Sequence, residues 1–522
     1  MADFNFLLST RLSQDQQQVL EILQQACRRA RLNLYLTGGP MRDLLIGHPV
    51  RFLHFTTEGS PLGLAQVLAA AGAEHVSPHP SLSSLDLTLR GVRLRLAAAQ
   101  SATGPGTIVE DLRRRGLTVN SIGLSLSPGS RGLPIDPTNG AADIEARLLR
   151  ITHPYVFLED PIVLLRTVRL ATRLEFAVEE RTQARMDSAR EGDYLQRASP
   201  GARGQELEAI AYEPDPATVL RALEKEGWLA AAFGAGVRTA KMNLSALTRL
   251  AAVVGGWELL GMNVDSGLAA LPLILGGLPP ADQNRLAQLL PSRHLAAVWK
   301  KIRPDAMQFE KRLLAASAGG GADWLRRAQE VIERTPAEAV VFATLEPSDA
   351  KAGKKLKDFQ AAAALLRQRL PLGVLRAAGM APHSQAAEAL LRPWYRRLLG
   401  GESLSDADLA EGMRKQVADK LPAPAASKSL SAGGKPAGGK PALKSAIAQA
   451  KAGAAKVPAK SPGTAPPSAS SASVPAKKFA PAAPAKNGGA RPASKPAAAK
   501  LRVAPARALK GKSKPAAKKK KR

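Results

Sequence analysis

The sequence predicts a small α/β head, a long all-α region after it and a disordered basic tail. Up to about residue 135, short apolar segments with strand character alternate with segments whose apolar residues recur at helical spacing. From there to about residue 415 only the helical pattern continues. The remaining residues are mainly Ala, Pro, Lys, Gly and Ser, a composition that cannot bury enough apolar surface to offset its ordering entropy.

The first predicted elements lie around a pair of glycines. Ser13 is expected to cap a helix, since apolar residues follow it at helical spacing, and residues 32–37 are an apolar strand candidate. Gly38 and Gly39 then allow a tight turn into the next helix. A backbone without side chains can approach phosphate oxygens closely, and a helix N-terminus offers free N–H groups, although most Gly-Gly pairs serve only as turns.

Further strands and a helix complete the predicted head. We expect a strand over residues 51–56, a helix over 62–71, and a hairpin of strands 85–90 and 92–96 joined at Gly91. In the hairpin, leucines alternate with polar residues, which indicates one buried face and one cationic outer face. The polar members of this alternation are Asp86, Thr88, Arg90, Arg93 and Arg95.

The helical region has candidate helices at residues 292–302 and 384–391, the second expected to end before Pro393. Its tryptophans sit among apolar neighbours and are expected in the core rather than as base-stacking platforms: Trp257, Trp299, Trp324 and Trp394. Two groups of cations could belong to a basic surface, although the sequence does not place them on one face. They are Arg392 with Arg396 and Arg397, and Lys354 with Lys355 and Lys357.

The positive charge is concentrated in the tail. The chain has 522 residues and a formal net charge of +30 at pH 7, and residues 421–522 contain 23 Lys and Arg and no Asp or Glu, which leaves +7 for the first 420 residues. Such a tail predicts nonspecific, salt-sensitive binding to nucleic acid, with a solubilising spacer as the alternative. The tail ends in Lys518, Lys519, Lys520, Lys521 and Arg522.

The cysteine count and the pattern of apolar residues exclude several classes of protein. Cys27 is the only cysteine, which excludes an internal disulfide framework and a cysteine zinc cluster. The first residues have no basic leader, and no apolar run is long enough to span a membrane. We therefore expect a soluble cytoplasmic protein without a membrane partner, while the oligomeric state is left open.

Five ordered blocks give the chain a family resemblance. Residues 36–47 hold the Gly-Gly turn and an Arg-Asp pair, residues 110–120 a Glu-Asp-Leu block with paired arginines, and residues 135–144 an Asp-Pro turn. Residues 157–169 and 201–207 follow with Glu-Asp-Pro and Gly-Gln-Glu-Leu segments. In this order the blocks resemble the class II tRNA nucleotidyltransferase (CCA-adding) and bacterial poly(A) polymerase family.

The resemblance implies an α/β nucleotidyltransferase head followed by an all-α neck and body. We expect the head at residues 1–140, a helical neck of nucleotide-template and RNA-binding character at 141–230, an all-α body and tail domain at 231–415, and the disordered basic tail at 416–522. Members of the family transfer CMP or AMP from CTP or ATP to an RNA 3′ end, with Mg²⁺ held by strand carboxylates. RNA, and tRNA in particular, is the implied partner.

The positions that the resemblance assigns to the metal carboxylates are changed. Phe52 and His54 stand in place of the Asp-x-Asp pair, and Arg95 stands in place of a third carboxylate. Phe52 cannot bind a metal, and one histidine is a weak ligand set even for zinc. A positive charge about 4 Å from a divalent ion opposes it by about 8 kcal/mol at an effective dielectric of about 20. No metal site is therefore predicted, and Mg²⁺ with CTP or ATP is expected only if activity is retained.

The implied nucleotide pocket is changed as well. Gly116 replaces an aspartate, and Val163 replaces an arginine that the resemblance places at the base edge. The Arg42–Asp43 pair can bind nucleotide or simply lock the turn as an ion pair. The implied nucleotide-binding set consists of Gly38, Gly39, Arg42, Asp43, Arg114, Arg115, Asn120, Asp160, Arg166 and Arg169.

Three functional hypotheses follow from this pattern. In the first, the chain is an RNA-binding protein of this family in which the scaffold residues persist and metal-dependent transfer is lost. In the second, it is an active CCA tRNA nucleotidyltransferase or polynucleotide adenylyltransferase with a rearranged metal site. In the third, the tail directs it to DNA or ribosomes and the head is only structural.

Overall fold

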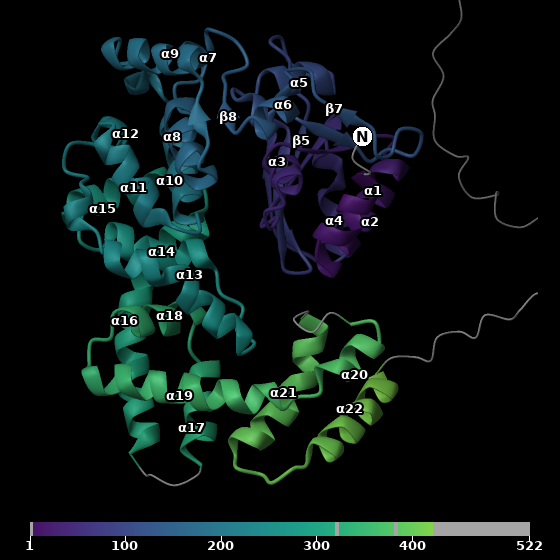
Figure 1. The fold of residues 1–522 in the computed structure, drawn as a ribbon, viewed down its shortest axis with the longest axis vertical. Coiled ribbons are helices and arrows are strands. Elements are labelled where there is room, and N and C mark those ends of the chain that lie inside the picture. The colour runs from purple at the N-terminus through teal and green to yellow at the C-terminus, as the bar shows by residue number, and fades with distance from the viewer. Residues whose placement is uncertain (1–3, 319–322, 381–384, 421–522) are drawn as a thin grey trace, which may run out of the picture. The chain divides into compact units, whose positions relative to one another are not determined.

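The computed structural model describes residues 4–318, 323–380 and 385–420. The basic tail from residue 421 onward, with the terminal cluster from Lys518 to Arg522, lies outside the described residues. Helix α22 (Asp406–Lys420) continues past the predicted start of the tail at residue 416, so the helical region is longer than expected. Figure 1 shows the α/β head in purple and blue and the helical region in teal and green.

The strands of the head form a mixed sheet. Among the described residues it has seven strands in the order β3-β4-β5-β2-β1-β6-β7, and β2 and β5 run parallel whereas the other pairs are antiparallel. The strands are β1 (Asn33–Thr37), β2 (Leu53–Glu58), β3 (Ala73–His79), β4 (Ser84–Leu89), β5 (Val92–Ala98), β6 (Gly123–Ser125) and β7 (Pro134–Ile135).

Two local sequence predictions for the head are confirmed. Ser13 forms a capping box with Gln16 at the start of α2, and the leucines of the hairpin are fully or nearly fully buried. Burial of alternate residues fixes which face of β4 and β5 meets the core. The head helices are α1 (Phe4–Arg11), α2 (Gln14–Arg29), α3 (Gly39–Ile46), α4 (Ala65–Ala70), α5 (Ile108–Arg113) and α6 (Gly140–Glu145).

The region after the head is helical with one exception. Strands β8 (Leu148–Leu149) and β9 (Ala177–Val178) pair in parallel, which the prediction of a purely helical neck missed because each has only two residues. The neck helices are α7 (Val156–Glu159), α8 (Val163–Leu174), α9 (Glu180–Glu191), α10 (Pro200–Ala211) and α11 (Pro216–Lys225). Helix α12 (Trp228–Phe233) follows and crosses the predicted division at residue 230. The domain divisions at residues 140 and 230 stay predictions.

Two helices of the body run through prolines. Helix α16 begins after Ser292 as expected but continues through Pro304, and α21 continues through Pro393, where we expected an end. Helix α16 spans Arg293–Ser317 and α21 spans Gln385–Leu399. The other body helices before α22 are α13 (Leu244–Leu259), α14 (Ser266–Leu275), α15 (Pro280–Leu289), α17 (Trp324–Glu333), α18 (Ala337–Leu345), α19 (Ala350–Gln368) and α20 (Leu372–Ala377). Trp257 and Trp299 are buried as predicted, and Trp324 and Trp394 are half-buried.

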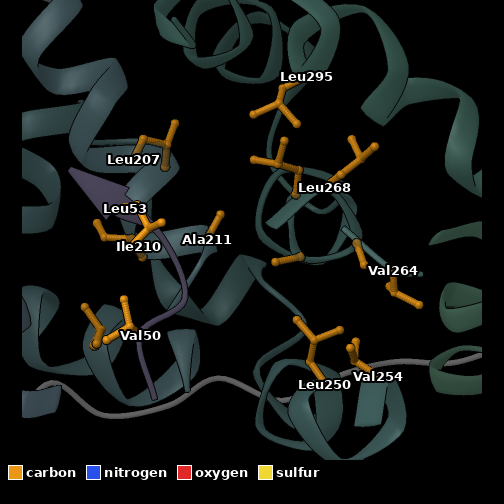
Figure 2. Close-up of a cluster of buried hydrophobic side chains, with 14 of the residues drawn as sticks. Val50, Leu53, Leu207, Ile210, Ala211, Leu250, Val254, Val264, Leu268 and Leu295 are labelled. Carbon is orange, nitrogen blue, oxygen red and sulfur yellow. The ribbon is translucent and has the colours of Figure 1, made fainter. Parts of the chain in front are cut away.

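Apolar packing continues from the head into the helical region. Figure 2 shows Val50, which precedes β2, and Leu53, the first residue of β2, in one buried cluster with Leu207 and Ile210 of α10. All four side chains are at most 7% exposed. This shared core joins the start of β2 to α10. None of the helices in the described ranges combines the length and apolarity that crossing a bilayer requires.

Candidate functional site

The Gly-Gly turn lies where β1 ends and α3 begins. Gly38 has a φ of +74°, and its N–H donates to the carbonyl of Ile122 at 3.0 Å. A Cβ at this position would lie 2.9 Å from Nη1 of Arg115 and 3.9 Å from Nδ1 of His54. The turn therefore requires glycine both for its conformation and for the close approach of these side chains.

Phe52 and His54 lie at the start of β2. Their rings make an edge-to-face contact with centroids 4.4 Å apart, and Phe52 remains 38% exposed. The Nε2 atom of His54 is buried and has no hydrogen-bond partner among the described residues. Because side chains alternate along a strand, His54 shares its face with Thr56 and Glu58. Glu58 was expected beyond the strand, but it is the last residue of β2.

One row of residues crosses three strands of this face. His54 pairs with Arg95 in the parallel register of β2 and β5, and Arg95 pairs with Asp86 in the antiparallel register of β5 and β4. Nε and Nη2 of Arg95 donate to the two oxygens of Asp86 at 2.6 and 2.7 Å. Burial opposes ionisation of Asp86, but the hydrogen bonds and charge of Arg95 hold the pKa of Asp86 below its ordinary value. The expected cationic outer face is thus partly neutralised.

A second arginine takes another carboxylate of this face. Nε and Nη2 of Arg115 donate to one oxygen of Asp111 at 2.9 and 2.6 Å, and Nη2 also donates to Thr56 at 2.7 Å. Arg95 and Arg115 therefore flank His54. Burial first, and then the charges of Arg95 and Arg115, lower the pKa of His54 from 6.5 to about 3, so its imidazole is neutral at physiological pH.

These residues do not fit a magnesium ion. Mg²⁺ requires oxygen ligands in near-octahedral geometry, whereas Phe52 offers none and Arg95 brings a positive charge. Asp86 and Asp111 are each held by an arginine, and Glu58 accepts hydrogen bonds from Asn33, Tyr35 and the backbone N–H of Ile108. Among residues 4–318, 323–380 and 385–420, no group of three His, Cys, Asp or Glu side chains is arranged to hold a metal ion.

The two altered nucleotide positions touch each other. Gly116 has a φ of +82°, and a Cβ there would lie 2.9 Å from Cγ2 of Val163 and 3.6 Å from Cγ1 of Val156. Val163, the first residue of α8, is fully buried. An aspartate at 116 would collide with Val163, and an arginine at 163 would have no space. The two departures from the family pattern are therefore sterically matched.

Several of the implied nucleotide-binding residues lie in a buried ion-pair network between head and neck. Arg42 and Arg173 both donate to Asp43, at 2.9 and 2.8 Å, and Nη1 of Arg42 also reaches Asn120 at 2.5 Å. Asp43 is thus shared between α3 and α8. Arg42 and Asp43 are 4% and 6% exposed, so their pairing locks the turn.

The same network continues along the neck. Arg169 donates to Glu206 and to Glu213, at 2.6 Å in each case. Arg173 and Arg51 reach the other oxygen of Glu213 at 3.5 and 3.3 Å. Burial opposes ionisation of Glu213, but the charges of the three arginines hold its pKa below its ordinary value. Arg169 is therefore occupied by protein carboxylates rather than directed at an open pocket.

The remaining implied residues are more exposed. Arg166 lies 4.0 Å from Asp160 and 3.8 Å from Glu206, and Asp160 is open to solvent. Arg114 is exposed and makes no ion pair with any described residue. Sequence reasoning missed Glu206, Glu213 and Arg173 as members of this arrangement, although Glu206 stands inside the 201–207 block that carries the resemblance.

Comparison with known proteins identifies the head. Residues 34–150 match the family model described as the poly A polymerase head domain. An A-adding tRNA nucleotidyltransferase from Halalkalibacterium halodurans is 32% identical over 232 residues, which cover 42% of this chain and 54% of that protein. A multifunctional CCA protein from Pseudomonas aeruginosa is 33% identical over 217 residues, which cover 38% and 50%. The chain spans about half the length of these curated relatives.

Solved structures resemble the chain more weakly. A CCA-adding enzyme with ATP is 22% identical and covers 80% of this chain and 99% of its own, with a TM-score of 0.43. A Thermotoga maritima CCA-adding enzyme complexed with tRNA is 21% identical with a TM-score of 0.40 and the same coverage. The family match assigns residues 34–150 to the poly A polymerase type of head domain. Part of the chain, including this head, is similar to tRNA nucleotidyltransferases and CCA proteins.

Proposed function

We propose that this protein is an RNA-binding member of its family in which metal-dependent nucleotidyl transfer has been lost. The row of His54, Arg95 and Asp86 carries the proposal. It puts a neutral imidazole and a guanidinium where the chemistry needs carboxylates, and it binds the neighbouring carboxylate to that guanidinium. The in-line displacement of pyrophosphate requires ions that neutralise charge at the attacking and leaving oxygens, and the one carboxylate of this row, Asp86, is already bound by Arg95.

The surrounding charges support the same proposal. Asp43, Asp86 and Asp111 are each within 3.0 Å of an arginine nitrogen. A metal ion would have to displace these guanidinium groups from carboxylates that they already neutralise. The matched pair Gly116 and Val163 also fills the space beside the head where the family resemblance expects nucleotide contacts.

RNA, and tRNA in particular, is the proposed ligand because curated relatives that are similar to this chain are named as tRNA nucleotidyltransferases and CCA proteins. The scaffold residues of the head persist while the metal and base positions have changed, which favours a retained binding role over general decay. The lysine-rich tail would add nonspecific affinity that decreases with salt. Mg²⁺ with CTP or ATP belongs only to the alternative of an active enzyme.

An incorporation assay tests the loss of transfer. The full chain is incubated with tRNA lacking its 3′ CCA, labelled CTP or ATP, and Mg²⁺ or Mn²⁺, beside an active relative as a positive control. We expect no incorporation by the unmodified protein, and the Phe52→Asp/His54→Asp variant serves as a comparison with restored carboxylates. Metal-dependent incorporation by the unmodified protein would refute the proposal and favour an active enzyme.

A binding assay separates the head and body from the tail. Removing residues 421–522 leaves every described helix and strand in place. We expect the shortened chain to retain binding to the same tRNA, with a weaker salt dependence than the full chain. If all tRNA binding disappears with the tail, the protein is a tail-driven nucleic-acid binder with a structural head.

A further inference from the structure

Tyr212, which follows α10, contacts both the head and the body. From the head, the guanidinium of Arg93 lies over its ring, 4.3 Å from the ring centroid, and Nη1 of Arg51 donates to its backbone carbonyl. Toward the body, its hydroxyl donates to Oδ2 of Asp265 at 2.8 Å, and its ring packs against Gly267 of α14. One side chain of the neck is therefore in contact with the head strands and with a body helix.

The contact with α14 is closely fitted. A Cβ at Gly267 would lie 2.4 Å from Cζ of Tyr212 and 2.5 Å from each Cε, so α14 needs glycine here to approach the ring. Asp265 is the N-cap of α14, and its other oxygen accepts from the N–H of Leu268 at 2.9 Å. Burial first, and then the charge of Asp265, raise the pKa of the Tyr212 hydroxyl, so it stays a donor at physiological pH. The tyrosine is thus tied to the first turn of α14.

The contact with the head comes from the face of the sheet that carries the altered site. Arg93 shares its face of β5 with Arg95, because side chains alternate along a strand. Nη2 of Arg93 also donates to Glu208, four residues before Tyr212 on α10, at 3.1 Å. A planar guanidinium that stacks on a ring and binds a carboxylate of the same helix has its orientation fixed by two contacts. Arg93 therefore joins β5 to the end of α10.

The contacts continue from α14 into the body. The backbone N–H of Asp265 donates to Glu338 of α18 at 3.0 Å. The residues next to these contacts belong to the buried cluster of Figure 2, which includes Ala211, Val264 and Leu268. A displacement of the Tyr212 ring would therefore disturb α14 and α18 as well as β5.

We propose that Tyr212 holds the head in one orientation against the body, so that β5 and α14 respond together to a change on either side. Contacts between domains of one chain usually permit relative motion. The close fit of the ring on Gly267 opposes sliding of α14, and the hydrogen bond to Asp265 fixes the direction of the side chain. The end of α10 is thus a rigid connection rather than a hinge. The inference holds whether or not nucleotidyl transfer is lost.

The test follows hydrogen exchange of β5 and α14 peptides in the full chain. Arg93→Gln removes the guanidinium from the ring, and the contacts of Arg93 that it removes are both to α10. Arg90→Gln is the matched control, since Arg90 is an exposed arginine at the turn of the same hairpin. Both changes are made in the unmodified chain and again in a Tyr212→Leu chain, which lacks the ring and the hydroxyl.

We expect Arg93→Gln to speed the exchange of α14 about fivefold, because the loss of the cation–π contact loosens the ring on which α14 packs. In the Tyr212→Leu chain the same change should alter α14 by less than about twofold. Arg90→Gln should leave α14 unchanged in both chains. If Tyr212→Leu does not fold, Tyr212→Phe takes its place. It removes only the hydrogen bond to Asp265, and the effect of Arg93→Gln on α14 should then decrease to about twofold.

Two results would overturn the inference. Unchanged exchange of α14 after Arg93→Gln would show that the head moves independently of the body, and faster exchange of β5 alone would then reflect a role within the head. An effect on α14 of the same size with and without the tyrosine side chain would show that the coupling follows another route, such as the charge of Arg93 acting directly on Asp265.

Discussion

His54 predicts how the stability of the head depends on pH. Its buried imidazole lies beside the guanidinium groups of Arg95 and Arg115, with Arg42 further away and Asp86 as the one opposing charge. Burial and the arginines lower its pKa from 6.5 to about 3. An unfolded chain therefore protonates this side chain near pH 6.5, whereas the folded head does so only near pH 3.

The sign and size of the effect follow from this difference. Between these two pH values the unfolded state binds more protons, so the free energy of unfolding falls as the pH is lowered. The loss is about 1.4 kcal/mol for each pH unit, or about 2 kcal/mol between pH 6.5 and pH 5. A variant without the imidazole, His54→Leu, lacks this contribution, so its stability should depend less on pH by that amount.

Hydrogen exchange of peptides from β2 and β5, corrected for intrinsic rates, gives the free energy of opening at each pH. We expect the unmodified head to lose about 2 kcal/mol more than His54→Leu between pH 6.5 and pH 5. His294→Leu removes an exposed histidine from α16 and serves as the matched control. In this variant the free energy of opening of β2 and β5 should depend on pH as it does in the unmodified protein. If the free energy of opening depends on pH equally in the unmodified protein and in His54→Leu, the reasoning that His54 is buried between two arginines with a lowered pKa is refuted.

Three further changes test the packing of the site by thermal unfolding. Gly140→Ala should lower the free energy of unfolding by more than about 2 kcal/mol, because its Cβ would lie 2.0 Å from a backbone carbonyl oxygen. The control Gly129→Ala places its Cβ in open space and should change stability by less than about 0.5 kcal/mol. Gly116→Ala and Val163→Ala should be coupled, with the double variant about 1 kcal/mol more stable than the sum of the single changes predicts. Arg173→Met should cost about 3 kcal/mol, because it leaves two buried carboxylates short of a partner, and a cost near zero would contradict the network.

The sequence was sufficient for part of the local structure of the head, since it predicted β1, β2 and the hairpin of β4 and β5 but not β3, β6 or β7. Alternating leucines predicted the hairpin of β4 and β5 because strand periodicity decides which side chains are buried, and Gly91 marked its turn. The same alternation put Asp86 and Arg95 on one face. Their direct pairing depends on the register of the two strands, which the pattern of leucines alone does not determine.

Proline misled the helix predictions. Pro393 was treated as the reason for a helix to end, since proline lacks the N–H that the helix interior uses, and the helix expected at residues 292–302 stopped short of Pro304. In α16, however, Ile302 and Ala306 on either side of Pro304 are buried in the body core. Packing on both sides of the proline can offset one lost hydrogen bond, and such tertiary support is invisible in a local window.

The ion-pair network was beyond a reading of neighbouring residues. Arg51 and Glu213 are 162 residues apart in sequence, and Arg173 and Asp43 are 130 apart. No periodicity or motif relates such positions, so their pairing depends on how the neck folds back on the head. For the same reason, the sequence could name Arg42 and Arg169 as nucleotide-binding candidates but could not find the carboxylates that occupy them.

If metal-dependent transfer is lost as proposed, the pairing of charges distinguishes remodelling of the site from loss of ligands alone. If single substitutions had only removed metal ligands, the remaining carboxylates of this face would stand as like charges without a counterion, and an unpaired charge that is largely buried costs several kcal/mol. Instead, Asp86 and Asp111 each have an arginine within 2.6 Å, and Val163 occupies the space that Gly116 leaves. The arginines supply permanently the positive charge that a bound metal would supply only when present. Under the proposed function, the charges of such a head are balanced without a metal, and we expect carboxylates at 52 and 54 alone not to restore activity.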